Sequence, residues 1–164
     1  MDFNITIAIL FLIIPLGLFI YQLFFGHYLK HNTCWISIGG IGITFIISLS
    51  FLIRTFFNEE GSKIAYGVYE WFSTGSFNLQ FGINIDNIAA IMLFVVSLVS
   101  LLVHLYSSEY MRDDLRFSRY YAFLGLFTFS MNGIVLADNL MMVYIFWELV
   151  GLSSFLLIGF WFEK

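Results

Sequence analysis

The sequence predicts an all-α integral membrane protein with five transmembrane helices and an external β-hairpin between helices 2 and 3. Two observations support this fold class. Hydrophobic residues make up 60% of the 164 residues and charged residues 11%, against roughly 25% charged residues in a soluble domain. The apolar residues gather in runs of about 20, the length that crosses a roughly 30 Å hydrocarbon core. We expect residues 1–164 to form a single membrane domain.

The five apolar runs define the predicted helices, and polar segments separate them. The first run is too long for the apolar region of a signal peptide, and no basic segment precedes it, so we expect a retained helix. Asp86 directly precedes the third run and is expected to cap that helix. The predicted helices are residues 5–25, 35–57, 87–106, 120–136 and 140–162.

The longest connection, between the second and third runs, has the pattern of a β-hairpin. Phe77, Leu79 and Phe81 alternate with polar residues, which is strand periodicity, and the triplet Thr74-Gly75-Ser76 suits a short turn. We expect a hairpin over residues 66–83 lying on the membrane surface. Its aromatic residues would suit an interfacial belt: Tyr69, Trp71 and Phe72.

The distribution of basic residues predicts the orientation, because cytoplasmic flanks hold the excess of Lys and Arg. Five such residues fall on one side and two on the other. The N-terminus and the hairpin are therefore predicted to be external. The five are Lys30, Arg112, Arg116, Arg119 and Lys164, and the two are Arg54 and Lys63.

Composition also excludes several classes of function. Seven Lys and Arg residues and a net charge of −4 provide no basic field for nucleic acid. The lone Cys34 excludes an internal disulfide and a thiolate metal site. The sequence contains no Gly-rich phosphate loop, no nucleophile elbow and no paired His at metal spacing. We therefore expect this chain to bind neither nucleotide, metal nor redox cofactor.

Glu148 is the main functional candidate, because it is the one formal charge in the predicted fifth helix. It lies about nine residues into that helix, near mid-membrane at 1.5 Å per residue. A charge at that depth costs a few kcal/mol and usually marks an ion or proton pathway. Gly151 and Gly159 share its face, which predicts close packing of another helix against the carboxyl group.

Two interpretations of Glu148 stay open. Burial favours the neutral form of a carboxyl group and a nearby cation favours the charged form. A Glu between these influences can load and release a proton. Alternatively, a permanently protonated Glu148 provides a hydrogen bond between helices. The sequence offers no cation at the same depth, so a partner would come from outside these 164 residues.

His104, near the end of the predicted third helix, is the second candidate. The ordinary titration range of imidazole lies near neutrality, which would let this side chain pass protons inward. The alternative is an interfacial His that bonds a helix-end carbonyl. The sequence leaves both open.

From residue 81 onward the chain resembles the antiporter-like membrane subunits of respiratory complex I, the proton-pumping NADH:quinone oxidoreductase. It is most similar to the distal subunit of this group, subunit L or chain 5. The residues before 81 match only in hydropathy and in the hairpin. The resemblance rests on Phe81-Gly-Ile-Asn-Ile-Asp86, His104-Leu-Tyr-Ser-Ser-Glu-Tyr-Met111, Arg119-Tyr-Tyr-Ala-Phe-Leu124, Leu136-Ala-Asp-Asn-Leu140 and the run from Phe146 to Trp161.

This resemblance implies that Glu148 is the proton-handling glutamate of the family, coupled to a lysine on a later broken helix. It implies that NADH, FMN, iron-sulfur clusters and quinone are bound by partner subunits. Family members contain many more helices, so we expect an N-terminal portion or one piece of a split subunit. Its expected partners are the remainder of that subunit, other membrane-arm subunits and lipid. A bacterial inner (plasma) membrane is favoured over a mitochondrial inner membrane.

Two other functions remain open at this point. The large subunit of a multisubunit cation/proton antiporter has a related core that shares the Trp147-Glu148 segment. A purely structural membrane-assembly protein is the second alternative.

Overall fold

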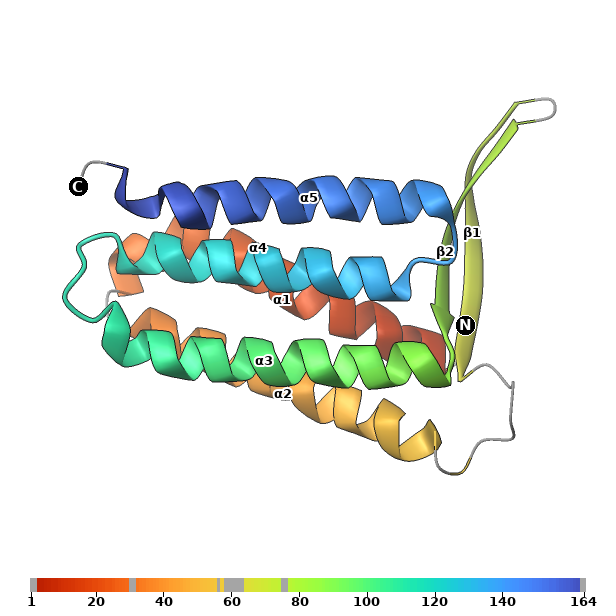
Figure 1. Ribbon diagram of the computed structural model, residues 1–164, viewed down its shortest axis with the longest axis horizontal. Helices are drawn as coiled ribbons and strands as arrows, with labels where there is room; N and C mark the ends of the chain where they lie inside the picture. Colours follow the sequence, from red (N-terminus) through yellow and green to blue (C-terminus); the bar gives the residue numbers. More distant parts are fainter. Residues whose placement is uncertain (1–2, 30–31, 56, 58–63, 75–76, 163–164) are drawn as a thin grey trace.

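Within the residues that the structure describes, five α-helices lie side by side, and a β-hairpin runs across one end of the bundle (Figure 1). The computed structural model describes residues 3–29, 32–55, 57, 64–74 and 77–162, without the side chains of 3, 29, 71–74 and 77–79. The elements are α1 (Phe3–Leu29), α2 (Asn32–Thr55), β1 (Ala65–Thr74), β2 (Phe77–Ile85), α3 (Asn87–Tyr110), α4 (Phe117–Leu136), α5 (Leu140–Ile158) and the 3-10 turn η1 (Gly159–Trp161).

The five predicted helices and the two predicted strands are confirmed. Their ends differ from the prediction. α1 extends past 5–25 at both ends, α3 continues past residue 106, and α4 begins before residue 120. Hydropathy marks where a segment leaves the hydrocarbon, whereas helical hydrogen bonds continue until a residue stops them. Polar residues such as Glu109 and Arg119 therefore lie within helices.

Helix α4 is the central helix of the bundle. It packs against α1, α3 and α5 and buries more of its residues than any other described helix. Close packing with α1 requires Gly125, because a methyl group there would lie 3.3 Å from the carbonyl oxygen of Pro15 and 3.4 Å from the amide nitrogen of Phe19. The other helices thus surround α4.

Four of the described helices, namely α1, α2, α3 and α5, are long and apolar enough to cross a membrane. The prediction of five spans is therefore supported for four helices. α4 is less apolar because it carries polar residues that the bundle buries: Thr128, Ser130 and Asn132. A central helix meets protein rather than lipid on most sides and tolerates such residues.

The β-hairpin lies close to the predicted 66–83. β1 and β2 are antiparallel, with Tyr69 opposite Phe81 and a register shift between Glu70 and Phe72. The side chain of Tyr69 is 73% exposed, as an interfacial aromatic residue would be, whereas the side chains of Trp71 and Phe72 and most of the predicted turn lie outside the described residues. Lys30, Lys63 and Lys164 are also outside them.

Strand β2 is tied to the junction of α4 and α5. The Asn139 side-chain amide donates a 2.8 Å hydrogen bond to the Gln80 carbonyl, and Ile83 forms an isolated bridge with Ala137. Because Gly82 has no side chain, the Asp138 carboxylate can pack directly against its backbone. The hairpin thereby restrains the point from which α5 begins.

Side-chain caps begin α3 and α5. Asp86 Oδ1 accepts a 2.7 Å hydrogen bond from the Ala89 amide, which confirms the predicted cap, and Asn139 Oδ1 accepts a 2.9 Å bond from Met142. Each cap satisfies an amide that the first helical turn leaves unpaired.

A buried apolar cluster fixes the base of the hairpin to the helix ends. Beside it, the Arg54 guanidinium donates to Asn4 Oδ1, and the Asn4 amide donates to the Ile64 carbonyl at 2.9 Å. This end of the bundle therefore holds α1, α2 and the hairpin together. The cluster comprises Ala8, Phe11, Phe51, Ile64, Ala65, Ile85, Ala90, Leu93 and Leu136.

The contact between α4 and α5 gives a first prediction. A Cβ atom at Gly133 would overlap the ring of Phe146, so Gly133→Ala must displace that ring or α5. We expect this change to lower the free energy of unfolding by about 1–3 kcal/mol, as overpacking usually does. Thermal melting of the detergent-solubilised protein measures the loss.

Gly17→Ala is the matched control, because nothing lies within 4 Å of a methyl group added there. Its melting temperature should stay level or rise slightly, since alanine favours helix over glycine. Equal melting of the two variants would show that Phe146 does not fill the space beside Gly133.

Candidate functional site

Glu148 lies in the middle of α5, as the ninth residue of a 19-residue helix and about 12 Å from its start at 1.5 Å per residue. It is the one charged residue in the helix. Its side chain is exposed on the outer side of the bundle, beside the exposed Trp147, Gly151 and Phe155. The structure therefore places a carboxyl group halfway along α5, on a face that is otherwise apolar.

No described helix packs against the Glu148 face, where a methyl group added at Gly151 would meet nothing within 4 Å. The predicted packing of another helix there stays a prediction. α5 buries the opposite side against α4, through Met142, Phe146 and Ser153. An α-helix rotates by about 100° per residue, so Glu148, two residues after Phe146, points to the opposite side of α5.

No hydrogen bond or ion pair reaches Glu148 from the part of the chain that the structure describes. Arg54 and Asp138 lie at the hairpin end of the bundle, where Arg54 donates to Asn4. That a cationic partner of Glu148 comes from outside these 164 residues stays a prediction.

His104 lies inside the bundle, with 1% of its surface exposed. Its Nδ1 is 2.8 Å from the Ser100 carbonyl oxygen, and because a carbonyl only accepts, Nδ1 carries the hydrogen. The hydroxyl of Tyr121 donates to the His104 carbonyl at 2.8 Å, and the two rings meet edge to face. His104 is thus a buried side chain held between α3 and α4.

The second ring nitrogen of His104, Nε2, is buried and has no hydrogen-bond partner among the described residues. The side chain borders a pocket of about 370 Å³ between α3 and α4. Ser100 and Thr128 give this pocket its other polar groups, and their hydroxyl oxygens are 2.6 Å apart. The remaining lining residues are apolar: Met92, Val95, Val96, Val99, Val103, Leu124, Phe127, Met131 and Leu157.

Sequence reasoning missed the polar stripe to which His104 belongs. Ser97, Ser100, His104 and Ser107 recur at spacings of three and four residues, which places them on one face of a helix. Three of the four hydroxyl or imidazole groups contact a neighbouring helix: Ser97 bonds Ser48 at 2.6 Å, Ser100 bonds Thr128, and Ser107 lies 3.3 Å from the Tyr120 hydroxyl. The spacing of these four residues in the sequence could have revealed the polar stripe.

The structure does not bring the two predicted site residues together. α4 lies between α3, which carries His104, and α5, which carries Glu148 (Figure 1). Among the described residues, no group of three or more His, Cys, Asp or Glu side chains is placed to hold a metal ion. That this chain binds no cofactor stays a prediction.

Together these observations fit one class of protein: an integral membrane protein built as a bundle of long apolar helices, with a carboxyl group halfway along one helix and a buried imidazole in another. Two family models match the chain. One, described as NADH-Ubiquinone oxidoreductase (complex I), chain 5 N-terminus, matches residues 71–121. The other, described as NADH:quinone oxidoreductase/Mrp antiporter, TM, matches residues 137–164, which include Glu148.

Similar proteins carry the corresponding names. The chain is 40% identical over 136 residues to NAD(P)H-quinone oxidoreductase subunit 5 of the Paulinella chromatophora organellar chromatophore, covering 83% of this chain and 20% of that one. It is 53% identical over 95 residues to NAD(P)H-quinone oxidoreductase chain 5 of Synechocystis sp., covering 58% and 14%. It is 41% identical over 157 residues to F(420)H(2) dehydrogenase subunit L of Methanosarcina mazei, covering 96% and 22%.

The chain therefore belongs to the family of antiporter-like complex I membrane subunits, and it matches the N-terminal part of their chain 5 or subunit L. It spans about one fifth of the length of the first relatives it matches. The resemblance predicted from the sequence is confirmed.

The polar contact between α3 and α4 gives a second prediction. Ser100→Ala, Thr128→Val and the double variant form a double-mutant cycle around the hydroxyl pair. We expect a coupling of about 0.6 kcal/mol in unfolding free energy, the mean for hydrogen bonds between membrane helices. Reversible unfolding in mixed micelles measures all four proteins.

A cycle that pairs Ser50→Ala with Thr128→Val is the control. The Ser50 hydroxyl donates to the Ile47 carbonyl of its own helix, so the two changes should be additive. If the Ser100 cycle were additive as well, the hydroxyl pair would contribute nothing to the contact between α3 and α4.

Proposed function

We propose that this chain is the N-terminal membrane part of an antiporter-like subunit of a proton-pumping quinone oxidoreductase, and that Glu148 carries the translocated proton. The observation that carries the proposal is the position of this carboxyl group, at mid-depth on an otherwise apolar face of α5. Family membership supports it, because residues 137–164 match a model for antiporter-like membrane segments.

The energetics of the exposed face indicate how Glu148 works. A carboxylate that faced lipid at this depth would cost about 2.5–3.5 kcal/mol even on insertion scales. We infer that the face formed by Glu148, Gly151 and Phe155 is covered by further helices of the same subunit. Burial there disfavours the carboxylate, while a cation on a covering helix would stabilise it. Movement of that cation would switch Glu148 between holding and releasing a proton.

The source of energy lies outside this chain in this proposal. The relatives' names describe subunits of enzymes that oxidise NAD(P)H or F(420)H(2). Partner subunits would bind NADH, FMN, iron-sulfur clusters and quinone, while this chain would hold no redox centre. Its direct partners would be the remainder of its own subunit, neighbouring membrane-arm subunits and lipid, in a bacterial inner membrane.

His104 is proposed as a relay between the aqueous phase and the interior. Its buried Nε2 has no hydrogen-bond partner among the described residues, and the His104 side chain borders a pocket whose other polar lining residues are Ser100 and Thr128. Along the stripe on α3, Ser107 and the Tyr120 hydroxyl lie on the side toward the arginine-bearing end.

The third prediction tests Glu148. Glu148→Gln keeps the size of the side chain and removes its ability to bind and release a proton. Proton uptake by sealed vesicles containing the assembled complex should fall by roughly 100-fold or more, the scale of losing a positioned proton-transfer group. A pH-sensitive dye measures uptake during electron transfer.

Glu109→Gln is the charge-matched control. Its carboxylate is exposed and pairs with Arg112 at 3.4 Å, so its loss should leave uptake unchanged. The Glu148→Gln protein should still be inserted and assembled. If it pumped normally, Glu148 would not carry the proton, and a purely structural membrane-assembly role would be favoured.

The fourth prediction tests His104. His104→Ala should lower the rate of proton uptake severalfold and enlarge the pocket between α3 and α4. Added imidazole should restore the rate, since a free ring in that space replaces the missing proton carrier. Thiophene, a heterocycle of similar size that cannot be protonated, should not restore the rate of proton uptake.

A structural role for His104 predicts a different result. In that case Tyr121→Phe, which removes the 2.8 Å bond to the His104 carbonyl, would lower uptake as much as His104→Ala does, and imidazole would restore neither protein. That pattern would contradict the relay.

A multisubunit cation/proton antiporter is the second candidate function. The model that matches residues 137–164 is described by both names, NADH:quinone oxidoreductase and Mrp antiporter. Purification of the assembled complex separates the two. Flavin and iron-sulfur chains in the purified complex support the oxidoreductase, whereas partners without redox centres support the antiporter.

A further inference from the structure

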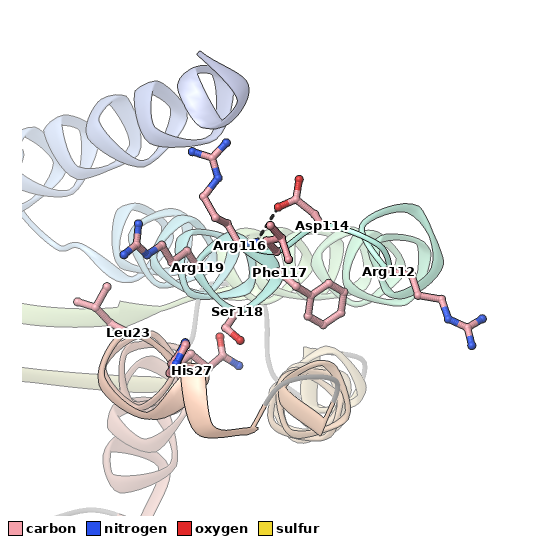
Figure 2. Close-up of a pocket in the computed structure, with 10 residues that line it drawn as sticks. Leu23, His27, Arg112, Asp114, Arg116, Phe117, Ser118 and Arg119 are labelled. Carbon is pink, nitrogen blue, oxygen red and sulfur yellow. Dashed lines mark hydrogen bonds between the residues drawn. The ribbon is translucent and has the colours of Figure 1, made fainter. Parts of the chain in front are cut away.

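The last turns of α1 and the start of α4 lie at the end of the bundle opposite the hairpin (Figure 1). A pocket of about 550 Å³ opens between them (Figure 2). Ser118 closes one wall, because its hydroxyl donates a 2.7 Å hydrogen bond to the Gly26 carbonyl. The lining residues are Gln22, Leu23, His27, Arg112, Asp114, Leu115, Arg116, Phe117, Ser118 and Arg119.

Three arginines border this pocket, and they differ in what they already contact. Arg112 pairs with Glu109 and points away from the other two in Figure 2. Arg116 places its guanidinium 5.3 Å from the centre of the Phe160 ring. Arg119 is exposed and forms no ion pair or hydrogen bond within the part of the chain that the structure describes. Arg119 is therefore the cation available to a ligand.

The one carboxylate of the pocket, Asp114, is already engaged. One of its oxygens accepts a 2.8 Å bond from the Arg116 amide and the other a 2.7 Å bond from the indole of Trp161. With three arginines and one aspartate, the lining has a formal charge of +2, His27 counted as neutral. An anion would meet a site whose acidic group is turned to other partners.

The start of α4 also favours an anion. This helix has no side-chain cap and no acidic residue in its first turn, and Arg116 and Arg119 stand at or near its N-terminus. Cations at that end oppose the helix macrodipole, whereas an anion is stabilised there by the dipole. A bound anion would therefore relieve an unfavourable arrangement already present in the fold.

The other pocket surfaces suit a lipid rather than a free anion. Gln22 is 1% exposed, and its Oε1 is buried with no partner among the described residues, while its nitrogen donates to Ser37. A headgroup hydroxyl can donate to that oxygen. Leu23 is 46% exposed on the outer side of α1, and Leu115 is fully exposed. Acyl chains would cover such residues at the end of membrane-crossing helices.

We propose that this pocket binds the headgroup of an anionic phospholipid. The phosphate lies at Arg119 and the start of α4, a headgroup hydroxyl donates to Gln22, and the acyl chains follow α1 past Leu23. Basic pockets between helices on the cytoplasmic side are a known mode of anionic lipid recognition. The bound lipid would join α1 to α4 at the end of the bundle that the hairpin does not brace.

The test measures lipid retention by the purified membrane complex that contains this chain, in neutral detergent, by native mass spectrometry. Phosphatidylglycerol should bind saturably and phosphatidylcholine should not. Arg119→Gln should weaken phosphatidylglycerol binding roughly fivefold, the effect of removing one basic contact at an anionic surface. Arg119→Lys should keep most of the affinity.

Arg112→Gln is the matched control, since it removes the same charge from the same end of the bundle but from a side chain that points away. An equal loss in Arg112→Gln would overturn the site, because it would show general attraction to anionic lipid. Equal retention of phosphatidylcholine would also overturn it. Displacement of the lipid by millimolar inorganic phosphate would identify a free-phosphate site instead. Circular dichroism confirms that each variant is folded.

Discussion

Lipid offers no hydrogen bonds, so polar groups inside a membrane bundle are turned toward protein or internal water rather than toward lipid. In this chain α4 meets that constraint by lying at the centre. It carries Thr128, Ser130 and Asn132, all buried. The first two donate to the Leu124 and Leu126 carbonyls of the preceding turn. α1, α3 and α5 then cover a helix that is less apolar than any of the four candidate spans.

Features that depend on neighbouring residues were predictable. Asp86 sits next to the helix that it caps, and Phe77, Leu79 and Phe81 alternate within one strand. The direction in which Glu148 points was not predictable from the sequence. Apolar side chains surround α5 on all sides, so hydrophobic periodicity does not distinguish the face that meets α4 from the face that meets something else. The glycine at position 151 suggested an inward face, whereas Gly133 on α4 is the one that receives α5.

His104 shows the opposite relation between sequence and structure. Its residue type drew attention, but the informative signal was the spacing of the serines around it, which indicates a polar stripe along α3. Helices α2 and α4 pair with that stripe through Ser48 and Thr128. Sequence alone cannot pair a stripe with its neighbours, because those hydroxyl groups come from helices whose order around the bundle is set by packing.

The central helix also governs how the two proton-handling candidates relate. Glu148 faces outward from α5, His104 faces inward from α3, and α4 separates them. Asn132 lies on that separating helix, one helical turn beyond Thr128, fully buried and with neither amide atom paired within the described residues. An unpaired buried amide costs about 1–3 kcal/mol, and interior water commonly satisfies such groups. Among the described residues, three of the six unpaired buried polar atoms thus belong to His104 and Asn132, on the neighbouring helices α3 and α4, and the other three to Gln22, Asn84 and Asn87.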